Sequence, residues 1–308
     1  MSAPFRLVLQ VRDKLYKAGV FKTHRLQHPV ISVGNLTLGG TGKTPLTIFL
    51  AEKMAERGFK PVVLSRGYRR TSRGTVIVSR GDGPITPWQQ AGDEPYLMAR
   101  RLAGKAAVVV GESRYLAGLK AESERLGDLF LLDDGFQHRQ LHRDFDIVTI
   151  DPDEWFRGES LLPTGRWREP KRAVLRAQAA CIQNGGYLDL PIPEFKVHLA
   201  AYGIHPATDL RGKSITAFAG IAKPERFFEK LESMGLHIAR KVAFPDHHRF
   251  SDSDLAQLGG DIRITTEKDA VRLEDRPGFS VLRVSATIAE FDRLQEMILL
   301  RLANSQCT

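Results

Sequence analysis

A glycine-rich segment near residue 40 contains the residue types that bind the phosphates of a nucleotide. Between a buried-strand pattern and a helical pattern lie Gly39, Gly40, Thr41, Gly42, Lys43 and Thr44. Glycines let backbone N–H groups converge on an anion, and the start of a helix adds its dipole. Lys43 can reach the β- and γ-phosphates of a nucleotide, and the Thr44 hydroxyl can bind Mg²⁺. The usual spacing GxxxxGK[ST] needs glycine at position 37, which is Thr37 here, so the loop is a variant of that motif.

A second apolar stretch ends in two carboxylates and supplies a candidate metal site. Leu129–Leu132 has the pattern of a buried strand and is followed by Asp133 and Asp134. Because the carboxyl ends of neighbouring parallel strands meet at one edge of a sheet, we expect these carboxylates near the glycine-rich loop. Asp133 is the candidate ligand of Mg²⁺. The alternative is a simple turn, since Asp-Gly pairs such as Asp134-Gly135 are common in turns.

Other segments offer a base and cationic groups for phosphate transfer. Asp93 and Glu94 lie at the start of a predicted helix, where the alternative role for Asp93 is a helix cap. Arg166 and Arg168 are guanidinium groups suited to bidentate bonding with phosphate, with a solvated basic loop as the alternative. The segment 65–70, SRGYRR, follows a strand and directs further cations toward the same edge.

Two histidines follow a strand pattern in the second half of the chain, in the segment FPDHHRF. Zinc binding by His247 and His248 is disfavoured, because no cysteine or further histidine lies at ligand spacing. An acid–base or orienting role fits better, with a purely structural histidine as the alternative.

Several nucleotide-using classes can be compared with these motifs. A GTPase would carry Asn/Thr-Lys-x-Asp, whereas the segment 265–269 reads TTEKD, with Lys268 one place too late. A metallochaperone ATPase should show a Cys or His cluster, which two distant cysteines, Cys181 and Cys307, do not form. The motifs favour a kinase, with another variant P-loop ATPase or an ATP-dependent ligase as the alternative.

The composition limits the partners of the chain. A formal net charge of +9 favours nucleic acid, an anionic lipid surface or a phosphorylated substrate. The sequence has no helix-turn-helix signature, Cys/His finger or RNP pattern, so we do not expect nucleic acid. It also lacks a run of about 18 apolar residues, and two cysteines fit a reducing compartment.

The N-terminal 30 residues are basic and amphipathic. Asp13 is the single acidic residue there, against Arg6, Arg12, Lys14, Lys17, Lys22 and Arg25. The apolar residues that fall near one helical face are Phe5, Val8, Leu9, Leu15, Tyr16 and Val20. Such a helix can lie in the headgroup plane of a bilayer, or it can pack its apolar side against its own domain.

Alternating strand and helix patterns predict an α/β fold, in which a mostly parallel sheet of the P-loop NTPase type has helices on both faces. We expect a kinase domain over 1–190, a linker or ribbon over 191–211 and a smaller α/β domain over 212–308. The expected strands of the first domain are Val30–Val33, Pro61–Leu64, Ala107–Val110, Leu129–Leu132, Asp146–Ile150 and Ala179–Gln183.

Taken in order, the motifs resemble those of the tetraacyldisaccharide 4′-kinase family of lipid A biosynthesis. Between residues 30 and 273 they read GNLTLGGTGKTP, LSRGY, GDEP, LLDDGFQH, GRWREP, FAGIAKPERFF, FPDHHRF and TTEKDAVRL. DDGFQH and the variant loop are the most specific, whereas Trp167 replaces an expected smaller aliphatic residue. The resemblance implies transfer of the γ-phosphate of ATP, with Mg²⁺, to the 4′-hydroxyl of a lipid A disaccharide 1-phosphate.

The resemblance also implies roles for particular residues. Asp93 accepts the proton of the acceptor hydroxyl and His247 orients or polarises that hydroxyl, which requires closure of the two domains that carry them. Arg168 and Lys43 neutralise the transferring phosphoryl group. Gln137 joins the glycine-rich loop in the ATP shell. The expected Mg²⁺ ligands are Thr44, Asp133, Asp134 and Glu94.

The resemblance implies a location as well. Family members are peripheral or N-terminally anchored on the cytoplasmic face of the Gram-negative inner membrane. We therefore expect a monomer that meets an anionic membrane surface and a lipid A disaccharide 1-phosphate there.

Overall fold

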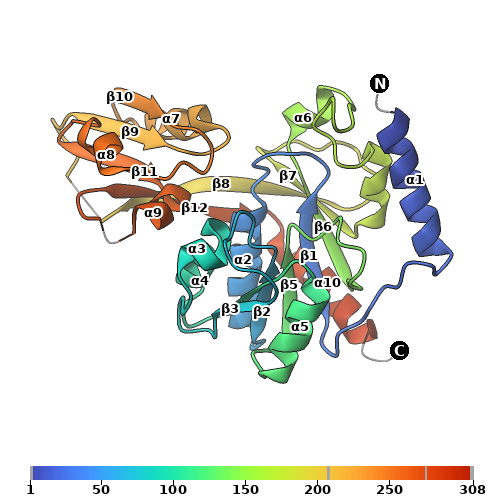
Figure 1. Cartoon of the computed structure of the whole chain (residues 1–308). Helices are drawn as coiled ribbons and strands as arrows, with labels where there is room; N and C mark the ends of the chain where they lie inside the picture. The colour runs from blue at the N-terminus through green and yellow to red at the C-terminus, as the bar shows by residue number, and fades with distance from the viewer. Residues whose placement is uncertain (1–2, 207–208, 275, 306–308) are drawn as a thin grey trace. The chain divides into compact units, whose positions relative to one another are not determined.

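The computed structural model describes residues 3–206, 209–274 and 276–305, and it divides into two compact units (Figure 1). Unit 1 contains Met1–Leu199 and Ala286–Thr308, and unit 2 contains Ala200–Ser285. The chain crosses the division within two strands, β8 (Glu194–His205) and β12 (Ser280–Ile288).

This division differs from the expected one at the C-terminus. The segment 191–211, expected as a linker or ribbon, contains the 12-residue strand β8. The C-terminal helix α10 (Phe291–Ser305) belongs to unit 1, because Leu294, Ile298 and Leu302 are buried in the core of that unit. Cys181 is a buried free thiol in β7, and Cys307 lies outside the described residues.

The sheet of unit 1 has the strand order β8-β7-β6-β1-β5-β2-β4-β3. Neighbouring strands are parallel except β3, which is antiparallel to β4, so the predicted mostly parallel α/β sheet is confirmed. The strand β3 was not expected. The bounds are β1 (Val30–Asn35), β2 (Pro61–Ser65), β3 (Val76–Ser79), β4 (Ala107–Val110), β5 (Leu129–Asp133), β6 (Phe145–Ile150) and β7 (Ala179–Gln183).

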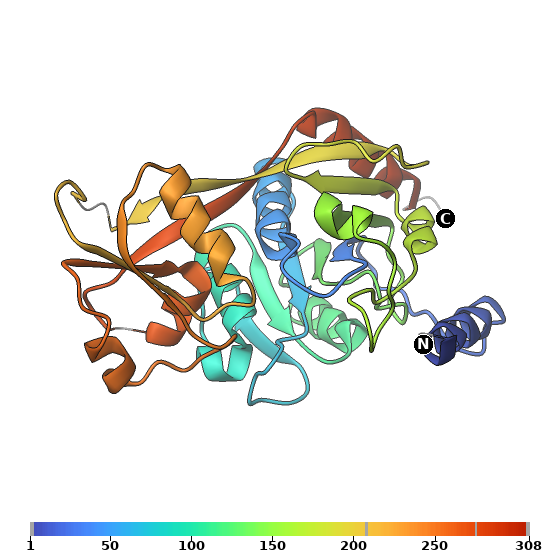
Figure 2. The same cartoon turned by 90° about the horizontal axis from the view of Figure 1, so that it is seen from above.

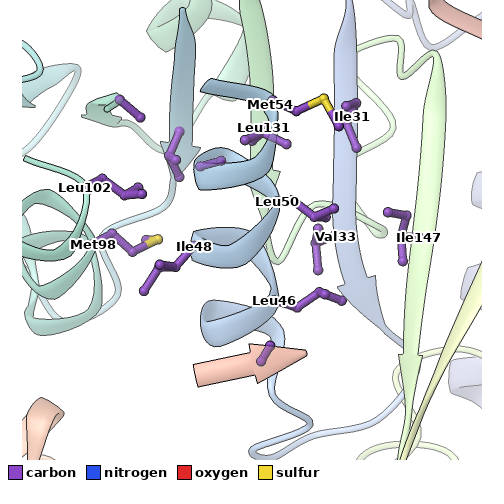
Figure 3. Close-up of a cluster of buried hydrophobic side chains, with 14 of the residues drawn as sticks. Ile31, Val33, Leu46, Ile48, Leu50, Met54, Met98, Leu102, Leu131 and Ile147 are labelled. Carbon is purple, nitrogen blue, oxygen red and sulfur yellow. The ribbon is translucent and has the colours of Figure 1, made fainter. Parts of the chain in front are cut away.

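Helices cover both faces of this sheet because successive strand residues point to opposite sides. On β1, Ile31 and Val33 pack with α2 (Lys43–Glu56), α4 (Asp93–Arg101) and α10, as Figure 3 shows for α2. Val30 faces the other side and packs in the cluster that includes Ala117 of α5 (Arg114–Ser123). The remaining helical elements of unit 1 are α1 (Ala3–Lys17), α3 (Trp88–Ala91), α6 (Pro152–Phe156) and the 3₁₀ helix η1 (Lys171–Arg176).

The predicted N-terminal helix is present as α1. Part of its apolar surface packs against unit 1, and another part is exposed. Leu9 is buried beside Phe5, whereas Leu7, Val8 and Val11 are 60%, 61% and 47% exposed. Arg12 lies 3.4 Å from Glu169, which joins α1 to the rest of unit 1. Among the described residues, every helix is too short or too polar to cross a membrane.

Unit 2 is a smaller α/β unit, as the alternating pattern predicts. Its strands have the order β10-β9-β11-β12 and are parallel. Helix α7 packs Phe227, Phe228 and Leu231 on one face, where Figure 2 shows it lying over the strands. The bounds are β9 (Ile215–Ala219), α7 (Pro224–Ser233), β10 (Ile238–Ala243), α8 (Asp252–Ala256), β11 (Ile262–Thr266) and α9 (Glu267–Leu273).

Candidate active site

The glycine-rich loop connects β1 to α2, as its sequence predicts. Gly42 precedes the helix with φ of 66°, a left-handed conformation that favours glycine, and Lys43 is the first helical residue. Thr41 is buried, and its hydroxyl accepts hydrogen bonds from the Asn35 amide at 2.8 Å and the Thr149 hydroxyl at 2.9 Å. Thr41 therefore anchors the loop to β1 and β6.

The two carboxylates lie beside this loop, because β5 pairs with β1 and Asp133 lies opposite Val33. Asp134 follows with φ of 52° and is held by cations on both sides. Lys43 Nζ lies 3.6 Å from Asp134, and Arg168 Nη1 donates to both of its oxygens at 2.8 Å. The structure thus brings together a lysine, an arginine and an aspartate that the sequence analysis singled out.

Asp133 is buried, and neutral groups are its hydrogen-bond partners. The hydroxyls of Thr47 and Ser65 donate to its carboxylate at 3.4 and 3.3 Å. Thr47 lies one turn beyond Thr44 along α2, and the expected role of Thr44 as a ligand of Mg²⁺ stays a prediction. Thr44 is half-buried as the second residue of that helix.

The electrostatic environments of these two carboxylates differ. Burial, together with the nearby charges of Glu94 and Asp134, raises the pKa of Asp133 to about 7. Burial also acts to raise the pKa of Asp134, but Lys43 and Arg168 outweigh it and hold that pKa below its ordinary value. The expected role of Glu94 as a further ligand of Mg²⁺ stays a prediction.

Arg114 is a residue of this cluster that the sequence analysis missed. It is the first residue of α5 after β4, it is buried, and its Nε has no hydrogen-bond partner among the described residues. Burial lowers its pKa to about 10, against the opposing effect of Asp134. Burial and the charge of Arg114 lower the pKa of His138 to about 4, so His138 is neutral at pH 7. The signal in the sequence that could have indicated Arg114 is its position shortly after the predicted strand Ala107–Val110.

Asp93 begins α4 but does not cap it. The N-cap is Gly92, whose φ of 91° favours glycine, and the buried Asp93 carboxylate accepts from the N–H of Glu94 at 3.0 Å. A Cβ on Gly92 would lie 3.2 Å from Gly67, so the loop after β2 approaches the start of α4 closely. The helix-cap alternative for Asp93 is therefore wrong in its usual form, and its proposed role as a base stays a prediction.

The arginine loop, residues 165–170, pairs with the chain that leads into the glycine-rich loop. Thr37 and Trp167 form an antiparallel bridge, and Arg168 N–H donates to Leu36 at 2.7 Å. Trp167 is buried, and its indole donates to Gly158 at 2.9 Å, which accounts for the large residue at this position.

Gln137 and Arg166, which the sequence also predicts for the site, lie beside the same segments. Arg168 also donates to Gln137 at 3.3 Å, while the Gln137 amide donates to the carbonyl of Asn35 at 2.8 Å. Arg166 donates to the carbonyl of Leu38 at 2.6 Å, which places it beside the glycine-rich loop. The alternative of a freely solvated basic loop is wrong for Arg168, whereas the side chain of Arg166 is 45% exposed.

His247 belongs to unit 2. Its φ is 63°, and its N–H donates to the carbonyl of Gly220 at 3.0 Å. Its ring Nε2 lies 3.4 Å from Lys268 Nζ. The neighbouring His248 pairs instead with Asp254 at 3.0 Å.

Comparisons with known proteins decide the family. The model of the tetraacyldisaccharide-1-P 4′-kinase family matches residues 1–303. The chain belongs to this family. It is 39% identical to the tetraacyldisaccharide 4′-kinase of Geobacter metallireducens over 294 residues, which cover 89% of this chain and 87% of that relative. It is 33% identical to the corresponding kinase of Aquifex aeolicus over 308 residues, which cover 96% and 95% of the two chains.

A solved structure agrees with this assignment. The crystal structure of LpxK from Aquifex aeolicus in complex with ATP superposes with a TM-score of 0.88 at 33% identity, covering 98% of this chain and 97% of that one. The predicted family, the α/β fold and the kinase class are confirmed.

The described residues of this tetraacyldisaccharide 4′-kinase family member fit a divalent cation bound together with phosphates. Asp133 is a buried carboxylate with no cation within ion-pair distance among the described residues, an arrangement that is costly without a compensating charge. In the described part of the chain, no three His, Cys, Asp or Glu side chains are placed to hold a metal by themselves. Mg²⁺ usually takes one or two carboxylates and completes its shell with water and substrate phosphates, so Asp133 suits it.

Proposed function

We propose that this chain transfers the γ-phosphate of ATP to the 4′-hydroxyl of a tetraacyldisaccharide 1-phosphate in lipid A biosynthesis. The observation that carries this proposal is the arrangement of Lys43, Asp134 and Arg168 beside the buried Asp133, where β1 and β5 end. The name of the family supplies the acceptor and the position of its hydroxyl.

The chain's own cations supply the electrostatic stabilisation that phosphoryl transfer requires. Lys43 and Arg168 converge on Asp134 from α2 and from the arginine loop. We assign both cations to the negative charge of the transferring group, with the N–H groups of Gly39–Lys43 and the side chain of Gln137 around the other phosphates. Bound by Asp133, with Thr44, Asp134 and Glu94 as further candidate ligands, Mg²⁺ would neutralise phosphate charge.

We assign the proton of the acceptor hydroxyl to Asp93. Its carboxylate is buried at the start of α4 and accepts a hydrogen bond from the N–H of Glu94. We assign to His247 an assisting role in orienting or polarising the hydroxyl, as the family resemblance implies. Both assignments concern general acid–base catalysis, which contributes roughly 10²–10⁴-fold to a rate.

We propose that α1 meets an anionic membrane surface on the cytoplasmic face of the inner membrane. Leu7, Val8 and Val11 are exposed on it, and its last turn carries Lys14 and Lys17. Next to it, Tyr16, Val20, Phe21 and Leu116 line part of a mainly apolar hollow of about 560 Å³. Replacing Leu7, Val8 and Val11 by Ser should weaken sedimentation with phosphatidylglycerol vesicles, whereas Leu300→Ser on α10, which is 60% exposed, should not. Equal binding by both variants would contradict the proposal.

The function is tested by transfer of labelled γ-phosphate from ATP to a detergent-solubilised lipid A disaccharide 1-phosphate. We expect transfer by the unaltered protein and by Asp252→Ala, an exposed aspartate that also begins a helix. Asp93→Ala should lose kcat far more than affinity for ATP. ATP hydrolysis without transfer would favour another ATPase, and an affinity defect alone would remove Asp93 from the role of base.

A further inference from the structure

Two sequence motifs of unit 2 meet at one buried carboxylate, and a third is linked to it through Gly220. Asp269, from the segment TTEKDAVRL, is fully buried at the first turn of α9. Both of its oxygens accept from the N–H of Gly220 at 3.1 Å, and one accepts from the Thr266 hydroxyl at 2.7 Å. Arg272, which follows on the next turn of the helix, forms a buried ion pair with the same carboxylate.

The Gly220 peptide links this pair to His247. Arg272 donates to the carbonyl of Gly220 at 2.9 Å, and the N–H of His247 donates to the same carbonyl at 3.0 Å. Both sides of the glycine are therefore held, its N–H by Asp269 and its C=O by Arg272. A Cβ on Gly220 would lie 3.1 Å from the Cβ of His248 and 3.2 Å from Asp269, so only glycine fits without displacement.

His247 needs such a support because of its backbone conformation. A φ of 63° is uncommon for a residue with a side chain, and such conformations persist only where the surroundings hold them. The same helix supplies a second contact, since Lys268 Nζ lies 3.4 Å from the His247 ring. The side chain of His247 is largely buried, at 11% exposed, so its orientation is set by these neighbours.

We propose that Asp269 and Arg272 are positioning residues of the kinase reaction, which fix the backbone and thereby the ring of His247 through the Gly220 peptide. This inference rests on the role assigned to His247 in the proposed function. A purely structural ion pair would stabilise unit 2 without any effect that depends on the histidine.

A double-mutant cycle in the full-length protein separates these two roles. We expect Asp269→Asn to lower kcat about tenfold with little change in the KM for ATP, since a displacement on the order of 1 Å can cost up to about 100-fold. In a His247→Ala background, which is itself slower, the same substitution should cause no further loss. An equal fold-loss in both backgrounds, or no loss in either, would overturn the positioning role. Full turnover by His247→Ala would overturn the assignment of the histidine itself, and this result is distinct from the other two.

Asp269→Asn leaves the Arg272 charge buried without its partner, so this variant can fail to fold. A milder pair of variants covers that case. Thr266→Val removes the hydroxyl that donates to Asp269, and Thr266→Ser keeps it. We expect a few-fold lower kcat for the valine variant only, and only when His247 is present. A loss that persists with His247→Ala, or that the serine variant shares, would overturn the proposal.

A matched control tests whether loss of a buried ion pair is sufficient to lower kcat. Arg143 and Asp146 form another buried pair with the same i, i+3 spacing, in unit 1. Asp146→Asn should lower the melting temperature with kcat unchanged. If Asp146→Asn lowers kcat as much as Asp269→Asn, the effect of Asp269 is not positional.

Discussion

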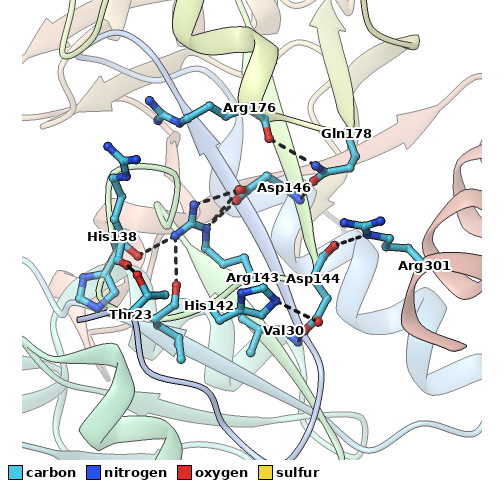
Figure 4. A network of polar contacts seen from close by, with 12 residues as sticks. Thr23, Val30, His138, His142, Arg143, Asp144, Asp146, Arg176, Gln178 and Arg301 are labelled. Carbon is cyan, nitrogen blue, oxygen red and sulfur yellow. Dashed lines mark hydrogen bonds and ion pairs between the residues drawn. The ribbon is translucent and has the colours of Figure 1, made fainter. Parts of the chain in front are cut away.

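Two polar clusters at opposite ends of the unit 1 sheet differ in how their charges are balanced. At the amino ends of β1 and β6, Arg143 donates to both oxygens of Asp146 at 2.9 and 3.2 Å through Nε, and to the carbonyls of His138 and Leu141 (Figure 4). Asp144 accepts from the N–H of Val30 at 2.8 Å. These charges are paired within the protein.

At the carboxyl ends of the strands, the two neighbouring carboxylates differ: Asp134 is paired with Lys43 and Arg168, whereas Asp133 is not paired with a cation among the described residues. Asp133 has hydroxyls as its hydrogen-bond partners, and its pKa is raised to about 7 by burial and by neighbouring carboxylates. Arg114 is buried with its pKa lowered to about 10 by burial. Buried groups with perturbed pKa values, such as Asp133 and Arg114, are typical of functional sites.

The largest expected effect is on catalysis at the carboxyl ends. Lys43→Ala should lower kcat at least about 100-fold, because a charge aimed at the transferring group is lost. Lys53→Ala on the same helix removes a lysine that pairs with Glu56 at 2.7 Å and should leave kcat unchanged. Steady-state transfer assays on both variants would contradict the account if their rates were similar.

The free energy of unfolding should depend on pH because of Asp133. Its pKa rises from an ordinary 3.8 to about 7 on folding, so between these pH values the folded state holds a proton that the unfolded state has lost. The free energy of unfolding of the unliganded protein therefore falls as pH rises through this window, by up to about 4 kcal/mol from this group.

Asp133→Asn should remove this fall in the free energy of unfolding with rising pH, because asparagine does not ionise. Denaturation series at pH 5 and pH 8 should show the variant gaining stability relative to the unaltered protein at the higher pH. An unchanged difference between the two pH values would show that Asp133 is not a strained carboxylate.

The cluster of Arg143 and Asp146 at the amino ends of the strands should lose stability when its carboxylate is removed. Asp146→Asn leaves the Arg143 guanidinium without its charged partner and should lower the free energy of unfolding by about 3 kcal/mol. Urea denaturation measures this loss. Full stability in the variant would mean that this cluster is not structural.

A smaller effect distinguishes two glycines within the loop. At Gly42, a Cβ would lie 2.6 Å from Gln183 Nε2, and φ is 66°, whereas at Gly40 nothing lies within 4 Å. Gly42→Ala should raise the KM for ATP about tenfold, in line with strain of roughly 1–2 kcal/mol. Gly40→Ala should change it less than about twofold. A reversed order would contradict the observed loop conformation.

The sequence predicted those features that local patterns determine. The β1 segment, the glycine-rich loop and α2 are continuous in the chain, and Asp133 directly follows an apolar strand, so strand pairing alone brings it to the loop. Arg114 could not be found in this way, because its burial beside Asp133 depends on the order of β4, β2 and β5 in the sheet.

Two other features depend on three-dimensional packing. The contact of Thr47 with Asp133 depends on the rotation of α2, which the sequence pattern does not reveal. The helical period of α10 predicts a helix but not the core that receives Leu294 and Ile298. The domain boundary therefore differs from the expected one.

The most direct measurement compares Asp133→Asn and Asp146→Asn for both phosphate transfer and free energy of unfolding. We predict that Asp133→Asn loses transfer at least about 100-fold and, at pH 8, is at least as stable as the unaltered protein. Asp146→Asn should keep transfer at the normal rate and lose stability. Normal transfer by Asp133→Asn would contradict the claim that the carboxyl ends of β1 and β5 form the active site.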